Sequence, residues 1–131
     1  MKIRYSDSTN EIEINPSRND LLNLSNKLLE DGAQITATIE ENSKAAPYER
    51  FLSGIKVKVL PKELVEFQVT SNDRLLIKGD RHKLSMLCEV LLSLTEDWSI
   101  GEYPTYKHLH IEHLTFDYLS SNSIPIVVVY A

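Results

Sequence analysis

The sequence predicts an α+β protein: a duplicated β-β-α-β-β unit that forms a mainly antiparallel sheet of about eight strands, with two helices on one face. Short segments in which apolar and polar residues alternate predict the strands. Two stripes of leucines at helical spacing predict the helices. A constant offset of 63 residues relates Ile14 to Ile77 and Leu24 to Leu87, which indicates that one unit is present twice.

The first half contains four predicted strands and one helix. Alternation places the strands at residues 2–5, 11–14, 35–39 and 55–59. Ser17, with Asp20 three residues later, is typical of a helix start. Leucines at helical spacing between residues 21 and 29 form the stripe that this helix buries, and Gly32 is expected to end it in the left-handed conformation.

The second half repeats this order. Strands are expected at residues 65–69, 74–78, 107–114 and 124–130. Asp80 is the expected N-cap of a second leucine-rich helix. The last strand is apolar on both of its faces, which indicates that it is central in the sheet or covered on its second side.

We therefore expect a single domain over residues 1–131, with pseudo-repeats at 1–60 and 64–131 related by a pseudo-twofold axis. The segment 38–40 matches 110–112 at an offset of 72, so His108 and His110 stand where the first copy has Thr36 and Thr38. A longer aromatic loop also precedes the histidine strand. Function is expected where the two copies differ.

Composition limits the class of protein. The chain has 131 residues, of which 42% are apolar and 25% charged, and its net charge is −5, which suits a globular domain with its own core. The sequence contains no stripe of Lys and Arg of the kind that binds a nucleic-acid backbone, and it contains no apolar run long enough to span a membrane. We expect a cytoplasmic protein in which Cys88, the one cysteine, is a small buried apolar residue.

The strand at 107–114 contains the densest group of chemically active side chains. Alternation places His108, His110 and Glu112 on one face and Leu109 and Ile111 on the other. Two imidazoles and a carboxylate are ligands that zinc or iron accepts. Alternate residues of a strand are about 6.6 Å apart, however, so a further ligand would have to come from elsewhere. We favour a polar face that contacts solvent or a partner, with no metal or other cofactor.

The sequence does not indicate an enzyme. Catalysis by Ser or Cys requires a nucleophile beside a base and an orienting acid, and no such arrangement stands out. The four glycines are scattered, so they form no phosphate-binding loop.

The loop before the histidine strand is the second candidate site. It contains Trp98, Tyr103 and Tyr106 among carboxylates. Aromatic rings can anchor a protein interface, and carboxylates attract a basic partner. The alternative is that the Trp98 ring closes one end of the core beneath its own loop.

Three segments resemble a known family. They are LIKGD at residues 76–80, HLH at 108–110 and SIPIVV at 123–128. In this respect the chain is similar to bacterial immunity proteins of polymorphic toxin systems, and in particular to immunity protein family thirty-two. The resemblance covers the second half well and the first half only through the internal repeat.

The resemblance implies a non-enzymatic protein of the cytosol that binds a cognate toxin protein and neutralises it. In that role His108, His110 and Glu112 would make polar contacts, and Trp98, Tyr103 and Tyr106 would be anchors. The net charge of −5 favours a basic partner. Two alternatives remain open: a metal-binding protein or metal-dependent enzyme that uses His108, His110 and Glu112, and a scaffold that oligomerises through a strand edge. The oligomeric state itself is not predicted.

Overall fold

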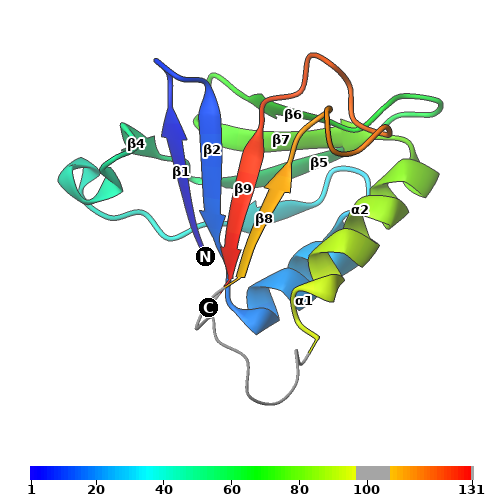
Figure 1. The fold of residues 1–131 in the computed structure, drawn as a ribbon, viewed down its shortest axis with the longest axis horizontal. Helices are drawn as coiled ribbons and strands as arrows, with labels where there is room; N and C mark the ends of the chain where they lie inside the picture. The colour runs from blue at the N-terminus through cyan, green and yellow to red at the C-terminus, as the bar shows by residue number, and fades with distance from the viewer. Residues whose placement is uncertain (97–106, 131) are drawn as a thin grey trace.

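The computed structural model describes residues 1–96 and 107–130 and has the α+β architecture that the sequence predicts (Figure 1). Within these residues nine strands form two sheets, and two α-helices and one short 3₁₀-helix accompany them. None of the described helices is both long and apolar enough to cross a membrane.

The first sheet has five strands in the order β4-β1-β2-β9-β8. Their bounds are β1 Lys2–Ser6, β2 Glu11–Asn15, β4 Arg50–Phe51, β8 Lys107–Ile111 and β9 Ile126–Tyr130. The hairpin β1–β2 and the pair β8–β9 are antiparallel, whereas β2 and β9 are parallel, with Ile12 opposite Ile126. The centre of this sheet therefore joins the first half of the chain to its end.

The second sheet has four strands in the order β3-β5-β7-β6. Their bounds are β3 Gln34–Thr36, β5 Gly54–Val59, β6 Glu66–Val69 and β7 Arg74–Gly79. The β6–β7 hairpin and the β3–β5 pair are antiparallel, and β5 and β7 are parallel, with Ile55 opposite Leu75. This sheet also has one strand of each half at its centre.

The predicted single sheet of about eight strands is therefore wrong, because the described strands form two mixed sheets, although most of their pairs are antiparallel as predicted. Alternation reveals which face of a strand is buried, but it does not identify the neighbouring strand. Both central pairs here are parallel, and a parallel pair needs a long crossover connection rather than a tight turn. Such pairing between distant segments leaves no local signal in the sequence.

Both helices begin where the sequence predicts. α1, Arg18–Lys27, has Ser17 as its N-cap: the Asp20 N–H donates to the Ser17 hydroxyl, and the Ser17 N–H donates to the Asp20 carboxylate at 2.8 Å. α2, Arg81–Ser93, is capped by Asp80, whose carboxylate accepts from the Lys83 N–H at 2.8 Å. These bonds satisfy amide groups that the first helical turn leaves without partners. α1 ends at Lys27 with Leu28 as its C-cap in the right-handed conformation, so Gly32, although it adopts a positive φ of 81°, does not end the helix as predicted.

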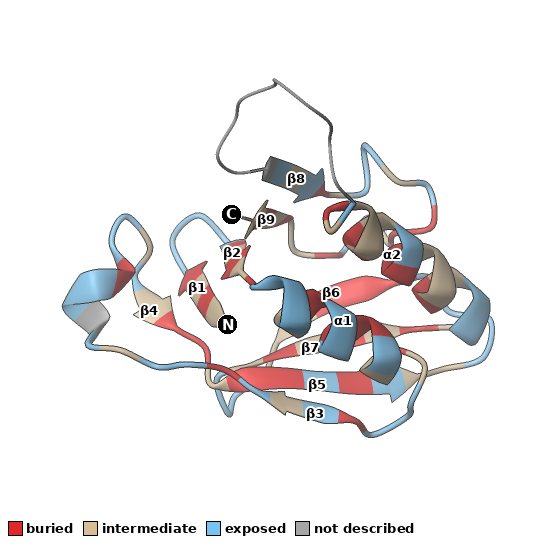
Figure 2. Ribbon diagram, turned by 90° about the horizontal axis from the view of Figure 1, so that it is seen from below, coloured by how far each residue is buried: buried red, intermediate tan, exposed pale blue. Residues whose placement is uncertain are grey.

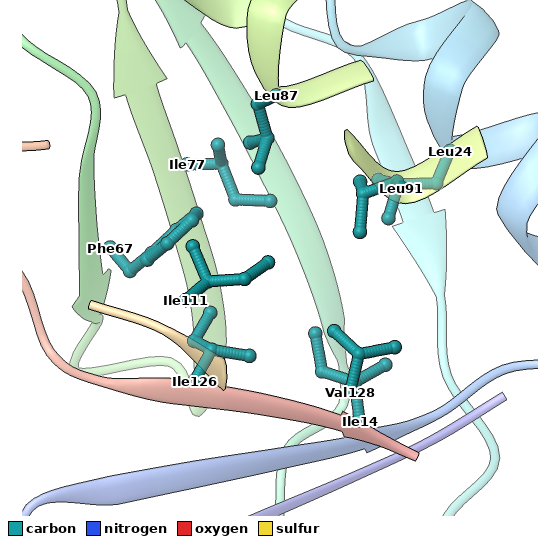
Figure 3. Close-up of a pocket in the computed structure, with 9 residues that line it drawn as sticks. All are labelled: Ile14, Leu24, Phe67, Ile77, Leu87, Leu91, Ile111, Ile126 and Val128. Atoms are coloured by element: carbon teal, nitrogen blue, oxygen red, sulfur yellow. The ribbon is translucent and has the colours of Figure 1, made fainter. Parts of the chain in front are cut away.

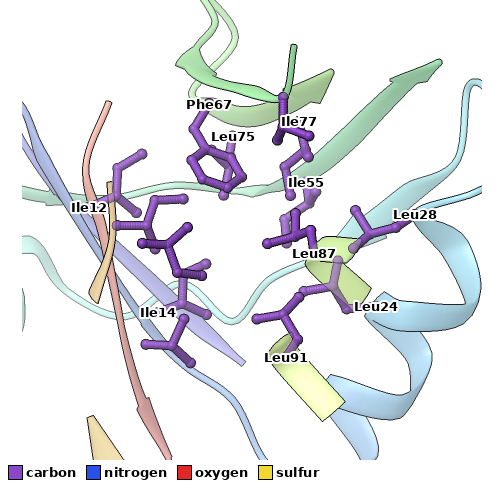
Figure 4. Close-up of a cluster of buried hydrophobic side chains, with 14 of the residues drawn as sticks. Ile12, Ile14, Leu24, Leu28, Ile55, Phe67, Leu75, Ile77, Leu87 and Leu91 are labelled. Carbon is purple, nitrogen blue, oxygen red and sulfur yellow. The ribbon is translucent and has the colours of Figure 1, made fainter. Parts of the chain in front are cut away.

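The two sheets and the helix pair surround one continuous hydrophobic core. Figure 2 shows β1, β2, β9 and β8 in one layer, β6, β7, β5 and β3 in another, and α1 and α2 along one side between them. The leucine stripes of the helices meet isoleucines of both sheets in this core (Figure 4). The helices thus cover the gap between two sheets instead of lying on one face of a single sheet.

Position 88 lies at the contact between the helices. Cys88 is buried, as expected, and its thiol donates to the backbone carbonyl of Ser25 at 3.3 Å. Burial raises the pKa of this thiol. Both features indicate a structural residue of the helix interface.

The third strand is shorter than predicted because the chain changes sheets there. β3 ends at Thr36. The next two amides, of Ala37 and Thr38, donate to the carbonyls of Ser53 and Met1, at 2.9 and 2.8 Å. Met1 immediately precedes β1, so the chain crosses from the second sheet to the first. The side chain of Ile39, predicted to lie in the strand, is 59% exposed.

The last strand is central, as the sequence predicts, because β9 lies between β2 and β8. The 3₁₀-helix η1, Asn42–Ala45, lies in the connection between β3 and β4. β4 follows it and pairs with β1 at the edge of the first sheet.

We expect the fragments 1–62 and 63–131 to be unable to fold separately, since each lacks one strand of both central pairs. Mixed in equal amounts, they should recover the circular dichroism and the cooperative thermal unfolding of the intact chain, which is the control. Cooperative unfolding of either fragment alone would show that the halves are independent.

Candidate functional site

The outer face of the five-stranded sheet carries two of the residues singled out from the sequence. Alternate residues of its strands, such as Ile14 and Val128, are buried in the core. On β8 the side chain of Ile111 is buried, whereas His108 and His110 are exposed. The structure thus brings the two histidines together on the face that points away from the core, as the alternation predicts.

Strand pairing gives the histidines two apolar neighbours. His108 is opposite Val129 on β9, and His110 is opposite Val127. Both valines are half-buried. On the other side of β9, Val127 is also opposite Glu13 of β2. The surface that we call the histidine face therefore consists of Glu13, Val127, Val129, His108 and His110.

An arginine limits the histidine face on the side away from β8. Arg4 of β1 is opposite Glu13 and forms an ion pair with its carboxylate. The Arg4 guanidinium donates to the backbone carbonyl of Ala46 at 3.2 Å and lies 5.1 Å from the centre of the Tyr48 ring. Arg4 thereby holds the segment around η1 against the edge of the sheet. The open part of the face lies over β9 and β8.

The phenol of Tyr48 reflects this partly enclosed environment. Burial raises its pKa, the carboxylate of Glu11 raises it further, and the positive charge of Arg4 opposes both effects. The Tyr48 hydroxyl therefore remains protonated at neutral pH and acts as a neutral group beside the ion pair.

The third member of the predicted cluster, Glu112, does not continue the strand. β8 ends at Ile111, and the next residues form a turn in which the Glu112 carbonyl accepts from the amides of Thr115 and Phe116, at 3.0 and 3.1 Å. The hydroxyl of Thr115 also donates to this carbonyl, at 2.9 Å. The Glu112 backbone is thus part of a closed turn at the end of the histidine strand.

The three aromatic residues proposed as anchors, Trp98, Tyr103 and Tyr106, lie outside the described residues. Among the residues that are described, no group of three or more His, Cys, Asp or Glu side chains lies together as a metal site would require. The histidine face offers polar and apolar contact groups with no assembled set of metal ligands in that part of the chain.

A small cavity lies inside the core rather than at the surface (Figure 3). Its volume is about 10 Å³, close to the minimum that one water molecule needs, and its walls are entirely apolar. The side chains that line it come from both sheets and both helices: Ile14, Leu24, Phe67, Ile77, Leu87, Leu91, Ile111, Ile126 and Val128. We interpret it as a packing gap where the two sheets and the helix pair meet, and not as a ligand site.

Sequence reasoning missed the neighbours of the histidines. Val127 and Val129 belong to the last strand, whose sequence is apolar on both faces. This pattern is the sequence feature that could have indicated apolar residues on the outer face. That Glu13 lies in the same row follows from the parallel β2–β9 pair, which alternation does not reveal.

No protein-family model, curated protein or solved structure matches this chain.

We expect protein purified without a tag to contain less than one equivalent of any transition metal, because the described residues offer His108 and His110 without a third ligand beside them. Elemental analysis, with the His108→Ala/His110→Ala variant as control, provides the measurement. One equivalent of zinc or iron that the variant lacks would instead establish a metal site.

Proposed function

We propose that this protein is a non-enzymatic immunity protein of a bacterial polymorphic toxin system, which acts in the cytoplasm. It binds a cognate toxin domain through the histidine face. The observation that carries this proposal is the composition of that face. Two exposed imidazoles lie beside half-buried valines on the outer side of the sheet. The segments HLH and SIPIVV, which resemble immunity proteins, lie in β8 and at the start of β9.

The chemistry of the face suits protein binding. Valines supply apolar area at the centre, and polar groups at the margin supply hydrogen bonds, which is the usual arrangement of a protein interface. Imidazoles can donate and accept hydrogen bonds, so His108 and His110 can match either kind of group on a partner. The net charge of −5 favours encounter with a basic toxin domain.

We also propose that the chain arose by duplication of one β-β-α-β-β unit, over residues 1–60 and 64–131. The strand orders support this. In the first sheet β1-β2-β9-β8 consists of a hairpin followed by two strands of the other half, and in the second sheet β6-β7-β5-β3 has the same composition with the halves exchanged.

The pairing register supports the duplication further. Ile14 and Ile77 are related by the offset of 63, and their partners in the parallel pairs, Val128 and Val57, are related by an offset of 71. Equivalent residues of β2 and β7 are therefore paired with equivalent residues of β9 and β5.

The helix contact fits the same symmetry. Cys88 and Ser25, which are hydrogen-bonded, are themselves 63 residues apart, as expected where a pseudo-twofold axis passes between α1 and α2. One detail changes. Ile111 pairs with Ile126 as Ile35 pairs with Ile55, so the offset in these strands is 76, not the 72 inferred from the sequence.

We expect co-expression of this protein to protect cells from the toxin domain encoded beside its gene. The double variant His108→Asp/His110→Asp should bind that toxin at least about tenfold more weakly, about 1.4 kcal/mol, because it removes both imidazoles and their contacts from the interface. Growth assays and calorimetry with the purified pair provide the measurements.

A matched control is available on the corresponding edge strand of the other sheet. Gln34 and Thr36 are exposed on β3, an edge strand of the other sheet, so Gln34→Asp/Thr36→Asp introduces the same two residues on an edge strand away from the histidine face. This control should protect as well as the wild type. Full protection by the histidine variant would exclude the histidine face, and killing that is unaffected by the wild-type protein would exclude immunity toward that toxin.

A further inference from the structure

The outer face of the four-stranded sheet is basic, although the protein as a whole is acidic. Residues that alternate with the buried ones on β5, β6 and β7 point away from the core. The charged members of this surface, which we call the basic face, are Lys56, Lys58, Arg74, Lys78 and Glu66, of which Glu66 alone is buried. Four positive charges and one negative charge give the face a charge of +3.

Most of this positive charge has no counter-ion within the described part of the chain. Glu66 accepts from Gln68 and lies 3.6 Å from the Lys78 ammonium, so these two charges offset each other. The side chains of Lys56 and Lys58 are exposed, and neither ammonium group forms a hydrogen bond or ion pair with a described residue.

The remaining cation contacts a neutral group. The Arg74 guanidinium donates to the side-chain oxygen of Gln34 at 2.9 Å. It reaches from β7 to β3 across Gly54, the residue opposite Arg74 on β5, which has no side chain in the way. Arg74 is therefore held in place on the face while its charge is not neutralised.

The charge of the face differs from that of the rest of the protein. Lys58 is directly opposite Lys78 in the β5–β7 register, and because Glu66 offsets the charge of Lys78, the charge of Lys58 has no counter-ion there. The chain has 14 Lys and Arg and 19 Asp and Glu; without the face, 10 and 18 remain, a charge of −8. The charge of the basic face is therefore opposite in sign to the charge of the rest of the protein.

We propose that the basic face is a docking surface for an acidic surface of a partner protein. Leu76 lies half-buried at its centre, between Lys56 and Gln68 in the register, so an apolar contact is surrounded by polar and positive groups. This arrangement is that of a protein interface. An acidic partner supplies the counter-charge that Lys56, Lys58 and Arg74 lack on this face.

A nucleic acid fits the face less well. The outward residues of the four described strands include no aromatic ring on which a base could stack. Three uncompensated charges neutralise few phosphates, and the charge of −8 on the rest of the protein repels a polyanion. The proposal does not rest on the immunity function, since the histidine face belongs to the other sheet.

The test measures binding of a fluorescent peptide of alternating Glu and Thr to the full-length protein, by anisotropy at low and at physiological salt. We expect binding that weakens with salt, and an affinity at least about tenfold lower for Lys56→Glu/Lys58→Glu. The control Arg18→Glu/Lys44→Glu changes the net charge equally at exposed sites on α1 and η1, and should stay within about twofold of the wild type.

Further arms make each outcome decisive. Lys56→Gln/Lys58→Gln removes both charges but keeps polar side chains, and it should also lose affinity. This second variant tests the proposal if the Glu variant fails to fold. No binding of the acidic peptide by the wild type, or an equal loss in the control, would overturn the proposal. Tighter binding of a single-stranded oligonucleotide of equal charge would also overturn it. So would self-association that light scattering detects in the wild type and not in Lys56→Glu/Lys58→Glu.

Discussion

The structure depends on two parallel strand pairs, β2 with β9 and β7 with β5. Each pair is the centre of a sheet, and each combines a strand from one half of the chain with a strand from the other. Parallel strands cannot be joined by a tight turn, so these pairs form only when the chain has passed through a helix or a longer segment. Side chains opposite each other in the two pairs, such as Ile12 with Ile126 and Ile55 with Leu75, are buried in the same core.

The helix pair closes the side between the two sheets, whereas in a single-sheet protein it would cover one face of that sheet. α1 and α2 lie against each other and close the side between the sheets, so leucines of both helices touch isoleucines of both sheets (Figure 4). Burial of each leucine contributes about 1.5–3 kcal/mol. Because this apolar area is shared, loss of one strand pair would expose part of every layer.

Local features of the fold were predictable, and those that depend on distant pairing were not. The caps Ser17 and Asp80 act within one helical turn, so their chemistry is visible in the sequence. Alternation also placed His108 and His110 on one face. It did not reveal that the strands divide into two sheets, that the chain leaves β3 after Thr36, or that Glu13 shares a face with His110. Each of these depends on which strands become neighbours.

The same distinction applies to function. The histidine face and the basic face are both built from ordinary outward residues of strands, and each has a definite composition only because the sheet order brings the strands together. The protein therefore has two surfaces of distinct chemistry, one on the outer face of each sheet.

Native-state hydrogen exchange tests most directly whether the two sheets and the helix pair form one cooperative unit. The amides of β2 and β9 should open with the same free energy as those of β5 and β7, equal to the global free energy of unfolding, as denaturant is raised. Protection that is lost from one central pair at a clearly lower free energy than from the other would contradict this account.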